Sequence, residues 1–363
     1  MTLLYSDVEE DLRSAVRQVL VERSPWTAVL ARAGGDEPYD RALWQALAAD
    51  VGCAGLAVPE KLGGAGASWR EAAVVAEEVG RAAAPVPHLG AAMATAALLA
   101  TVDDGWADDD LLAAVAAGET TAVLVLGLAT PPSVAVPTSV RAANGALTGV
   151  VTGVADALAA DVLAVPTNDG LWAVDAGDAR LTPLTTLDLT RRLCDVAFEG
   201  APARPLAGPA AAAHAWRAAL RVGAALLAAE QLGIASWCLD ATVTHLNTRH
   251  QFGRPVGSFQ ALKHRLAELW VAIAQARAVA RYAAGCVADE DPDTAIAVAV
   301  AQAHCSPVAV RAAEECVQMH GGIGFTWEHP AHLYLKRAKS AAIALGTADQ
   351  HRAALATLVD LPG

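Results

Sequence analysis

The sequence predicts a mainly α-helical protein with a small β domain, and three observations support this fold class. Hydrophobic residues make up 54% of the 363 residues, much of that share is alanine, and aromatic residues account for only 5%. This composition favours closely packed helices over an aromatic-rich β-sandwich. Helical periodicity of the apolar residues holds in the first third and in the last part of the chain. Between them lie short β-branched runs separated by Gly, Pro, Asn and Asp.

The first unit is predicted to span residues 1–118 and to be helical. Val8, Leu12 and Val16 recur at intervals of four residues, which places them on one face of a helix. Residues 52–66 contain clustered glycine and a proline, and neither a helical nor a strand period continues through them. We therefore expect a loop there, between two helical stretches.

The second unit, residues 119–205, is predicted to be a small β domain. Its β-branched runs are short, as in strands that alternate with turns. They fall at residues 121–126, 150–152, 162–166 and 171–174.

The third unit, residues 206–363, is predicted to be helical, with a long first helix from about 211 to 248. Breaks are expected where Gly, Pro or clustered Asp interrupt the pattern. These breaks lie near residues 253–255, 289–293 and 320–322.

Charge and cysteine content exclude several classes of function. The net charge of -13 argues against nucleic-acid partners, because phosphate binding needs a basic surface. The six cysteines form no Cys-x-x-Cys pair and no Cys/His spacing of a metal site, so we expect reduced thiols, a cytoplasmic location and no metal. The start of the chain is acidic, unlike a signal peptide. The apolar run at 89–100 is too short for the roughly 20 residues that span a bilayer, so no membrane insertion is expected.

Two blocks of sequence identify a family resemblance. Residues 318–339 read QMHGGIGFTWEHPAHLYLKRAK, and residues 249–260 read RHQFGRPVGSFQ. Together these blocks resemble the acyl-CoA dehydrogenase family, and the loop at 52–66 is similar to a turn near the amino terminus of its members. The resemblance covers nearly the whole chain. It implies an N-terminal helical domain, a middle β domain and a C-terminal antiparallel four-helix bundle.

The resemblance implies that the chain binds FAD. The matching arginine of the family, here Arg249, holds the FAD of a neighbouring subunit, and a guanidinium fork suits a pyrophosphate. For an isolated arginine, an electrostatic cap on its helix would be the simpler interpretation. The glycines Gly321 and Gly322 match a pair that lets the backbone approach the adenosine closely. The predicted cofactor-binding residues are Arg249, Gln251, Phe252, Phe259, Gln260, Gln318, Gly321, Gly322 and Thr347.

The catalytic base of the family is missing from both of its usual positions. Leu345 stands where members carry a glutamate that removes a proton next to the CoA thioester, and leucine cannot accept a proton. The alternative position on the long helix falls on Gly223 or its neighbours Val222 and Ala224, none of which is an acid. Glu230 is one substitute, although pairing with an arginine at a subunit contact is the preferred interpretation. Glu328 is the second substitute. No residue of this chain is therefore predicted to be catalytic.

The β domain also departs from the family pattern. Residues 128–134 and 150–156 correspond to the loop and strand that hold the flavin ring, but the serine, the acidic residue and the tryptophan of the family's pattern are absent. Thr130 or Thr152 could preserve one hydrogen bond. The chain's own flavin pocket is therefore predicted to be poorly formed.

These observations favour a non-catalytic subunit of a heteromeric acyl-CoA dehydrogenase, similar to the actinobacterial enzymes of steroid side-chain breakdown. The predicted partner is a homologous subunit in an α2β2 assembly that shares FAD and supplies the glutamate. An acyl-CoA substrate, with a steroid side chain, and an electron acceptor are implied by the resemblance. Two alternatives stay open: a self-sufficient homotetramer with a displaced base, and a scaffold subunit without cofactor.

Overall fold

The first part of the chain is helical in the computed structural model, which describes residues 2–35, 37–102, 106, 108–137 and 139–361. The outer ends of the first and last predicted units therefore lie outside the described residues. Ser6 and Ser68 begin α1 and α4 with capping boxes, in which the serine side chain and a glutamate three residues later bond each other's backbone. The helices are α1 (Asp7–Arg23), α2 (Trp26–Ala33), α3 (Arg41–Gln45), α4 (Trp69–Arg81), α5 (His88–Val102) and α6 (Asp109–Ala116).

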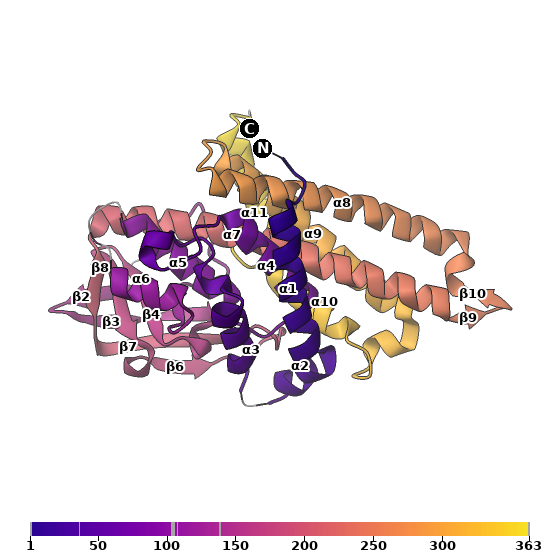
Figure 1. The fold of residues 1–363 in the computed structure, drawn as a ribbon, viewed down its shortest axis with the longest axis horizontal. Helices are drawn as coiled ribbons and strands as arrows, with labels where there is room; N and C mark the ends of the chain where they lie inside the picture. The colour runs from indigo at the N-terminus through magenta and orange to yellow at the C-terminus, as the bar shows by residue number, and fades with distance from the viewer. Residues whose placement is uncertain (1, 36, 103–105, 107, 138, 362–363) are drawn as a thin grey trace.

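The middle of the chain forms two four-stranded sheets that pack face to face (Figure 1). One sheet has the order β1-β4-β5-β8 and the other β2-β3-β7-β6. Val123, Leu163 and Val196 fill the space between the sheets, while Leu124 and Ala164 on the opposite face of the first sheet join the helical core. This alternation follows from the two-residue period of a strand. The strands are β1 (Ala122–Leu124), β2 (Val140–Ala143), β3 (Ala146–Ala155), β4 (Val162–Thr167), β5 (Gly170–Asp175), β6 (Arg180–Pro183), β7 (Leu193–Pro202) and β8 (Arg204–Ala207).

The last part of the chain is a helical bundle whose far end projects beyond the rest of the molecule (Figure 1). A two-stranded hairpin, β9 (His250–Gln251) and β10 (Arg254–Pro255), lies at this projecting end, which we call the bundle tip. The helix α9 packs against the four other helices of the bundle. These helices are α7 (Pro209–Thr248), α8 (Gln260–Ala288), α9 (Thr294–His320), α10 (Ala331–Ala341) and α11 (Ala348–Leu358). The predicted fold class is confirmed, and the division into three domains stays a prediction.

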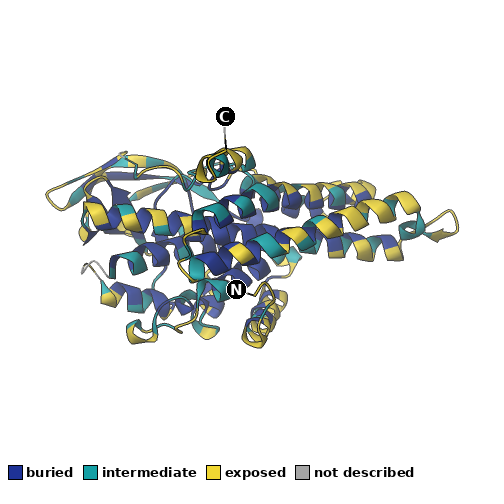
Figure 2. Ribbon diagram, turned by 90° about the horizontal axis from the view of Figure 1, so that it is seen from above, coloured by how far each residue is buried: buried dark blue, intermediate teal, exposed yellow. Residues whose placement is uncertain are grey.

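Residues near the bundle tip are more exposed than those at the opposite end of the bundle (Figure 2). In α7, 89% of the most apolar window is buried, which is typical of a core helix. A second apolar stretch, Thr294–Phe325, is 56% buried over its window. Both are long and apolar enough to cross a membrane by length and composition, but their apolar faces pack against the protein itself.

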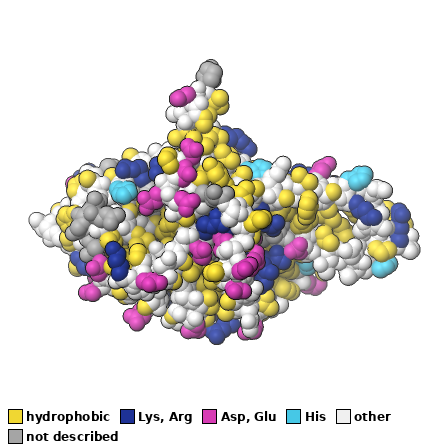
Figure 3. Space-filling model, turned by 45° about the horizontal axis from the view of Figure 1, so that its top comes forward, with side chains coloured by type: hydrophobic (Ala, Val, Ile, Leu, Met, Phe, Trp, Pro, Cys, Tyr) yellow, Lys and Arg dark blue, Asp and Glu magenta, His cyan; other side chains and the backbone are white. Residues whose placement is uncertain are grey.

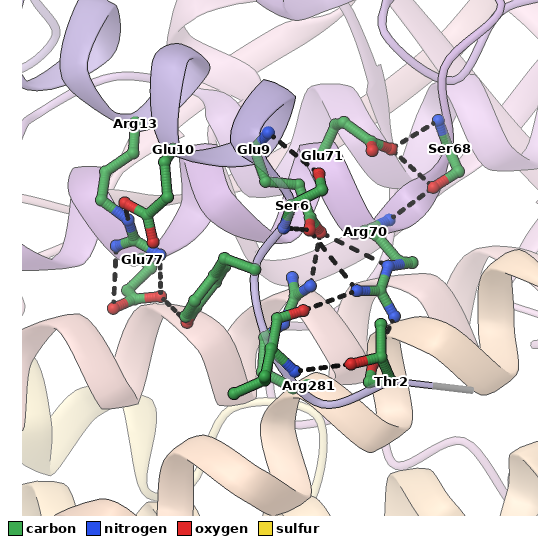
Figure 4. A network of polar contacts seen from close by, with 12 residues as sticks. Thr2, Ser6, Glu9, Glu10, Arg13, Ser68, Arg70, Glu71, Glu77 and Arg281 are labelled. Carbon is green, nitrogen blue, oxygen red and sulfur yellow. Dashed lines mark hydrogen bonds and ion pairs between the residues drawn. The ribbon is translucent and has the colours of Figure 1, made fainter.

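The N-terminal helices α1 and α4 contact the bundle through close backbone packing and buried ion pairs. A Cβ on Gly233 of α7 would lie 1.9 Å from the carbonyl oxygen of Glu77 on α4, so these helices cross with only glycine between them. Glu9 of α1 pairs with Arg70 of α4 and with Arg281 of α8, and both its carboxylate oxygens are buried (Figure 4). These contacts fix the N-terminal helices relative to the bundle.

Candidate functional site

The turn that carries Leu345 is packed against the loop after β1. The Leu345 N–H donates to the carbonyl of Leu128 at 2.7 Å, and the side chain is fully buried. A Cβ on Gly346 would lie 2.8 Å from the Cβ of Pro131, so the two segments touch. His351 reaches the Leu345 carbonyl at 2.9 Å from the other side. The position at which the sequence predicts the family's base is therefore occupied by a buried leucine on a packed turn.

The second base position is closed as well. Gly223 is buried in α7, and a Cβ there would lie 2.6 Å from the sulfur of Met93 on α5. A glutamate side chain would have to displace Met93, because α5 and α7 are in direct contact at this point. Both usual base positions thus lie in the apolar core.

The two segments that correspond to the family's flavin-ring loops lie side by side. The Leu128 N–H donates to the Gly153 carbonyl at 2.9 Å, and Gly127 forms a bridge with Val154. Thr130 is half-buried and Thr152 is exposed. Within the described part of the chain, neither hydroxyl has a hydrogen-bond partner. The structure thus places residues 127–131, 152–154 and 345–346 side by side. Backbone hydrogen bonds join these three segments directly.

Glu230 is buried between two arginines of its own chain. Arg337 of α10 donates from its Nε to the Glu230 carboxylate at 2.8 Å, and Arg191 donates to the other oxygen. Burial alone would raise the pKa of Glu230, but the two guanidiniums outweigh it and lower the pKa to about 2. This geometry opposes a role as general base, which needs a pKa near the working pH.

The expected pairing of Glu230 with an arginine at a subunit contact needs a correction. Its partners come from the loop before β7 and from α10, 39 residues before it and 107 residues after it. Sequence reasoning missed Arg191 and Arg337, because no local pattern marks them as buried. Arg337 lies inside one of the family blocks, and its position there was the signal that could have drawn attention to it.

Glu328, the other substitute, is exposed in the segment between α9 and α10. It follows Trp327, whose ring is 59% exposed and lies 4.7 Å from the Nζ of Lys336. A solvated carboxylate in this position lacks the buried, apolar surroundings that are typical of a catalytic base.

Eight of the nine predicted cofactor-binding residues lie at the bundle tip. Arg249 caps the end of α7 and is exposed, and Gln318 is exposed in the last turn of α9. Gly321 has a φ of 62°, and added Cβ atoms on Gly321 and Gly322 would meet no other atom within 4 Å. The glycine loop is therefore open to a ligand. The remaining tip residues of the prediction are Gln251, Phe252, Phe259 and Gln260.

The tip combines positive charge with exposed aromatic rings. Residues 241–267 contain four Lys or Arg, three His and no acid, although the whole chain carries a charge of -13. Phe252 is 90% exposed, and the guanidinium of Arg254 lies 4.0 Å from the ring of Phe259. Lys, Arg and His side chains gather at this end in the space-filling view (Figure 3). Such a surface suits an anionic ligand with a planar ring.

The ninth residue, Thr347, lies at the other end of the bundle. Its hydroxyl accepts from the Gln350 N–H at 3.3 Å and caps α11. A groove of about 570 Å³ adjoins this turn and is lined by Pro131, Arg221, Val298 and His351 among others. Val298 and Gln318 are separated along α9 by about 30 Å at 1.5 Å per residue. Thr347 and the bundle tip of one chain therefore cannot both contact the adenosine part of a single bound FAD.

Comparison with known proteins identifies the family. The model of the acyl-CoA dehydrogenase N-terminal domain matches residues 6–119, and that of the C-terminal domain matches residues 213–359. Acyl-CoA dehydrogenase IpdE2 of Mycobacterium tuberculosis is 40% identical over 333 residues, which cover 91% of each chain.

Two solved structures have the same fold over the full length. A Tcur3481-Tcur3483 steroid ACAD is 31% identical, with a TM-score of 0.83 over 99% of both chains. A chain of the ChsE4-ChsE5 complex from Mycobacterium tuberculosis is 27% identical, with a TM-score of 0.86 over 100% of both chains. The chain therefore belongs to the acyl-CoA dehydrogenase family, whose members are oxidoreductases.

Proposed function

We propose that this chain is the non-catalytic subunit of a heteromeric, FAD-dependent acyl-CoA dehydrogenase of the cytoplasm. A homologous partner subunit supplies the glutamate that removes the α-proton, in an assembly with two of each chain. The bundle tip of this chain binds the adenosine and pyrophosphate part of an FAD that the partner holds by its ring. An electron-transfer acceptor then reoxidises the assembly.

The contrast between the two ends of the bundle is the observation that carries this proposal. At one end, Leu345 and Gly223 fill both base positions with buried apolar atoms. At the other end, Arg249 and the glycine loop face solvent. The residues at the tip fit the charged part of FAD, because a guanidinium and open backbone suit a pyrophosphate. The segments around Leu128 offer few partners for a flavin ring, since the Leu128 N–H already donates to Gly153 and the ring-holding residues of the family's pattern are absent.

Bound FAD would accept the hydride that leaves the carbon next to the deprotonated one. The residues of this chain would hold its pyrophosphate and adenosine, and they would not move a proton. The names of two similar structures, a steroid ACAD and the ChsE4-ChsE5 complex, support a heteromeric assembly and a steroid side-chain CoA thioester as substrate.

The test of this proposal is the flavin content of the complex that co-purifies with the chain from its native host. Arg249→Ala removes the guanidinium that holds the pyrophosphate, so we expect the affinity for FAD to fall at least tenfold, as for the loss of about 1.4 kcal/mol or more of binding energy, and the complex to lose flavin during purification. Absorbance near the flavin maximum, measured per mole of complex, gives the result.

Arg217→Ala is the matched control, since Arg217 is also exposed on α7 but lies near its opposite end. This variant is expected to retain its flavin. An Arg249→Ala complex with unchanged flavin would contradict the proposal and favour a scaffold subunit without cofactor contact.

A further inference from the structure

Three histidine rings form a continuous stack just below the surface of the bundle tip. The ring centroids of His245 and His320 are 4.3 Å apart, and those of His320 and His329 are 4.2 Å apart. The interplanar angles are 31° and 34°, so the rings face one another. Within the described residues, no group of three His, Cys, Asp or Glu side chains is arranged to hold a metal ion. The stack is therefore a packing contact between imidazoles.

The stack joins the two segments that carry the tip's cofactor-binding residues. His245 lies in the last turn of α7, four residues before Arg249. His320 ends α9 and directly precedes Gly321 and Gly322. His329 follows the glycine loop and lies just before α10. Through these rings, the end of α7 is held against both ends of the glycine loop.

The middle ring is the anchor of the stack. His320 is 5% exposed, and its Nδ1 lies 2.7 Å from the carbonyl oxygen of Cys316 and 3.6 Å from the Cys316 sulfur. The outer rings are more accessible, because His245 and His329 are only half-buried. A proton from solvent can therefore reach either outer ring while the middle ring stays fixed.

We propose that His245, His320 and His329 are positioning residues that hold Arg249 and the glycine loop in register for FAD, and that mild acid opens the stack and releases the cofactor. This inference rests on the proposed function and adds a regulatory property to the same site. None of the three histidines needs to touch FAD.

The charged surroundings determine the direction of the pH effect. Burial lowers the pKa of His245, as do its neighbours His320 and Arg249. Burial also lowers the pKa of His329, and the positive charge that His320 and His245 can carry brings it to about 4. For His320, burial opposes charge, but the hydrogen bonds with Cys316 outweigh it and raise the pKa. His332 on α10 also lowers the pKa of His329, Lys336 in turn acts on His332, and Cys238 on α7 lies beside Cys316, which contacts the middle ring.

The lowered pKa values of the two outer rings determine whether acid stabilises or destabilises the stack. A histidine with a lowered pKa favours the closed stack while it is neutral, and this contribution is lost as the pH falls below the ordinary value near 6.5. His320 acts in the opposite direction, because its raised pKa favours the stack when it alone is charged. Once His320 carries a positive charge, a proton that binds to either outer ring places a second positive charge beside it, and the two charges repel each other. The stack should therefore loosen between about pH 6.5 and pH 4.

The experiment measures release of FAD from the purified native complex by its fluorescence as the pH is lowered from 8 to 4. The double variant His245→Phe/His329→Phe keeps the ring stack but removes both acid-labile sites. We expect its midpoint of release to lie about one pH unit or more below that of the native complex. His214→Phe, near the opposite end of α7, is the control and should leave the midpoint unchanged. Coinciding profiles of the double variant and the native complex would overturn the inference.

Two further measurements keep the result interpretable. If the double variant does not assemble, His329→Gln is measured in the same way, and an unchanged midpoint would again overturn the inference. Hydrogen exchange of residues 318–330 at pH 5.5 should be slower in the double variant than in the native complex, and equal rates would contradict the stack's role without reference to FAD. Failure of the proposed function has a separate signature, since Arg249→Ala would then keep its flavin at pH 8.

Discussion

Glu230 illustrates how a single residue can resemble a catalytic base in the sequence and serve another purpose in the structure. It is the nearest acid on α7 to the alternative base position, and its side chain is 2% exposed. Burial of a carboxylate would normally raise the pKa, but Arg191 and Arg337 lower it instead. Asp188 adds a second carboxylate 3.6 Å from Arg337. The carboxylate of Glu230 therefore ties α7 and α10 to the β domain.

Glu230→Gln should lower the free energy of unfolding by about 3 kcal/mol, because it leaves two buried guanidiniums with one carboxylate fewer. Denaturant unfolding at pH 7 measures the loss. Glu314→Gln is the control: Glu314 pairs with Lys339 at the surface, and both side chains are about half exposed, so a change within about 0.5 kcal/mol is expected.

The same carboxylate gives a pH dependence. Because the pKa of Glu230 is lowered from 4.5 to about 2, its contribution to stability is present above pH 4.5 and is lost as the pH falls toward 2. Glu230→Gln should remove this part of the acid sensitivity. If it instead abolished dehydrogenase activity of the complex while stability stayed unchanged, the displaced-base alternative would be favoured.

At the scale of elements, the turn between α10 and α11 closes onto the loop after β1. The hydrogen bond from Leu345 to Leu128 joins residues more than 200 positions apart in the chain. Leu345 also has a φ of 51°, an uncommon conformation for a leucine that the surrounding contacts maintain. The position that the sequence predicts for the family's carboxylate is thus a packed contact between two elements.

Restoring the glutamate at this turn should not restore a site. Leu345→Glu buries an unpaired carboxylate in the apolar core, so we expect a loss of stability of about 3 kcal/mol or more. The chain alone is expected to remain inactive in dye reduction with CoA thioesters. Leu345→Met, which keeps the volume, should lose less than about 1.5 kcal/mol. Flavin-dependent activity of Leu345→Glu in the isolated chain would show that the site is open after all.

The elements themselves were largely predictable, and their contacts were not. The expected helix of about 211–248 is α7, Pro209–Thr248, and the breaks near 253, 289 and 320 separate the helices that follow it. Gly and Pro mark such breaks locally. The family blocks also pointed to the tip residues around Arg249. The pairing of Glu230 with Arg191 and Arg337, and the stacking of three histidines from two helices and a loop, depend on tertiary contacts that no local pattern encodes.

For the whole molecule, the two ends of the bundle present different surfaces. One end is joined to the β domain and closed around Leu345 and Gly223, and the other projects a basic, aromatic surface with Arg249 and Phe252. Such an asymmetry is expected of a chain that completes a site on another subunit, because a two-fold assembly can bring the tip of one chain to the cofactor of its partner. The exposed tip would then become buried on assembly.

The most direct test counts flavin per chain in two preparations, the chain purified alone and the complex that it forms with its homologous partner. We predict that the chain alone holds no FAD and reduces no dye with an acyl-CoA, and that the complex holds about one FAD for each pair of unlike chains, as a shared site requires. A chain that, purified alone, holds one FAD per molecule and oxidises a CoA thioester would contradict the account.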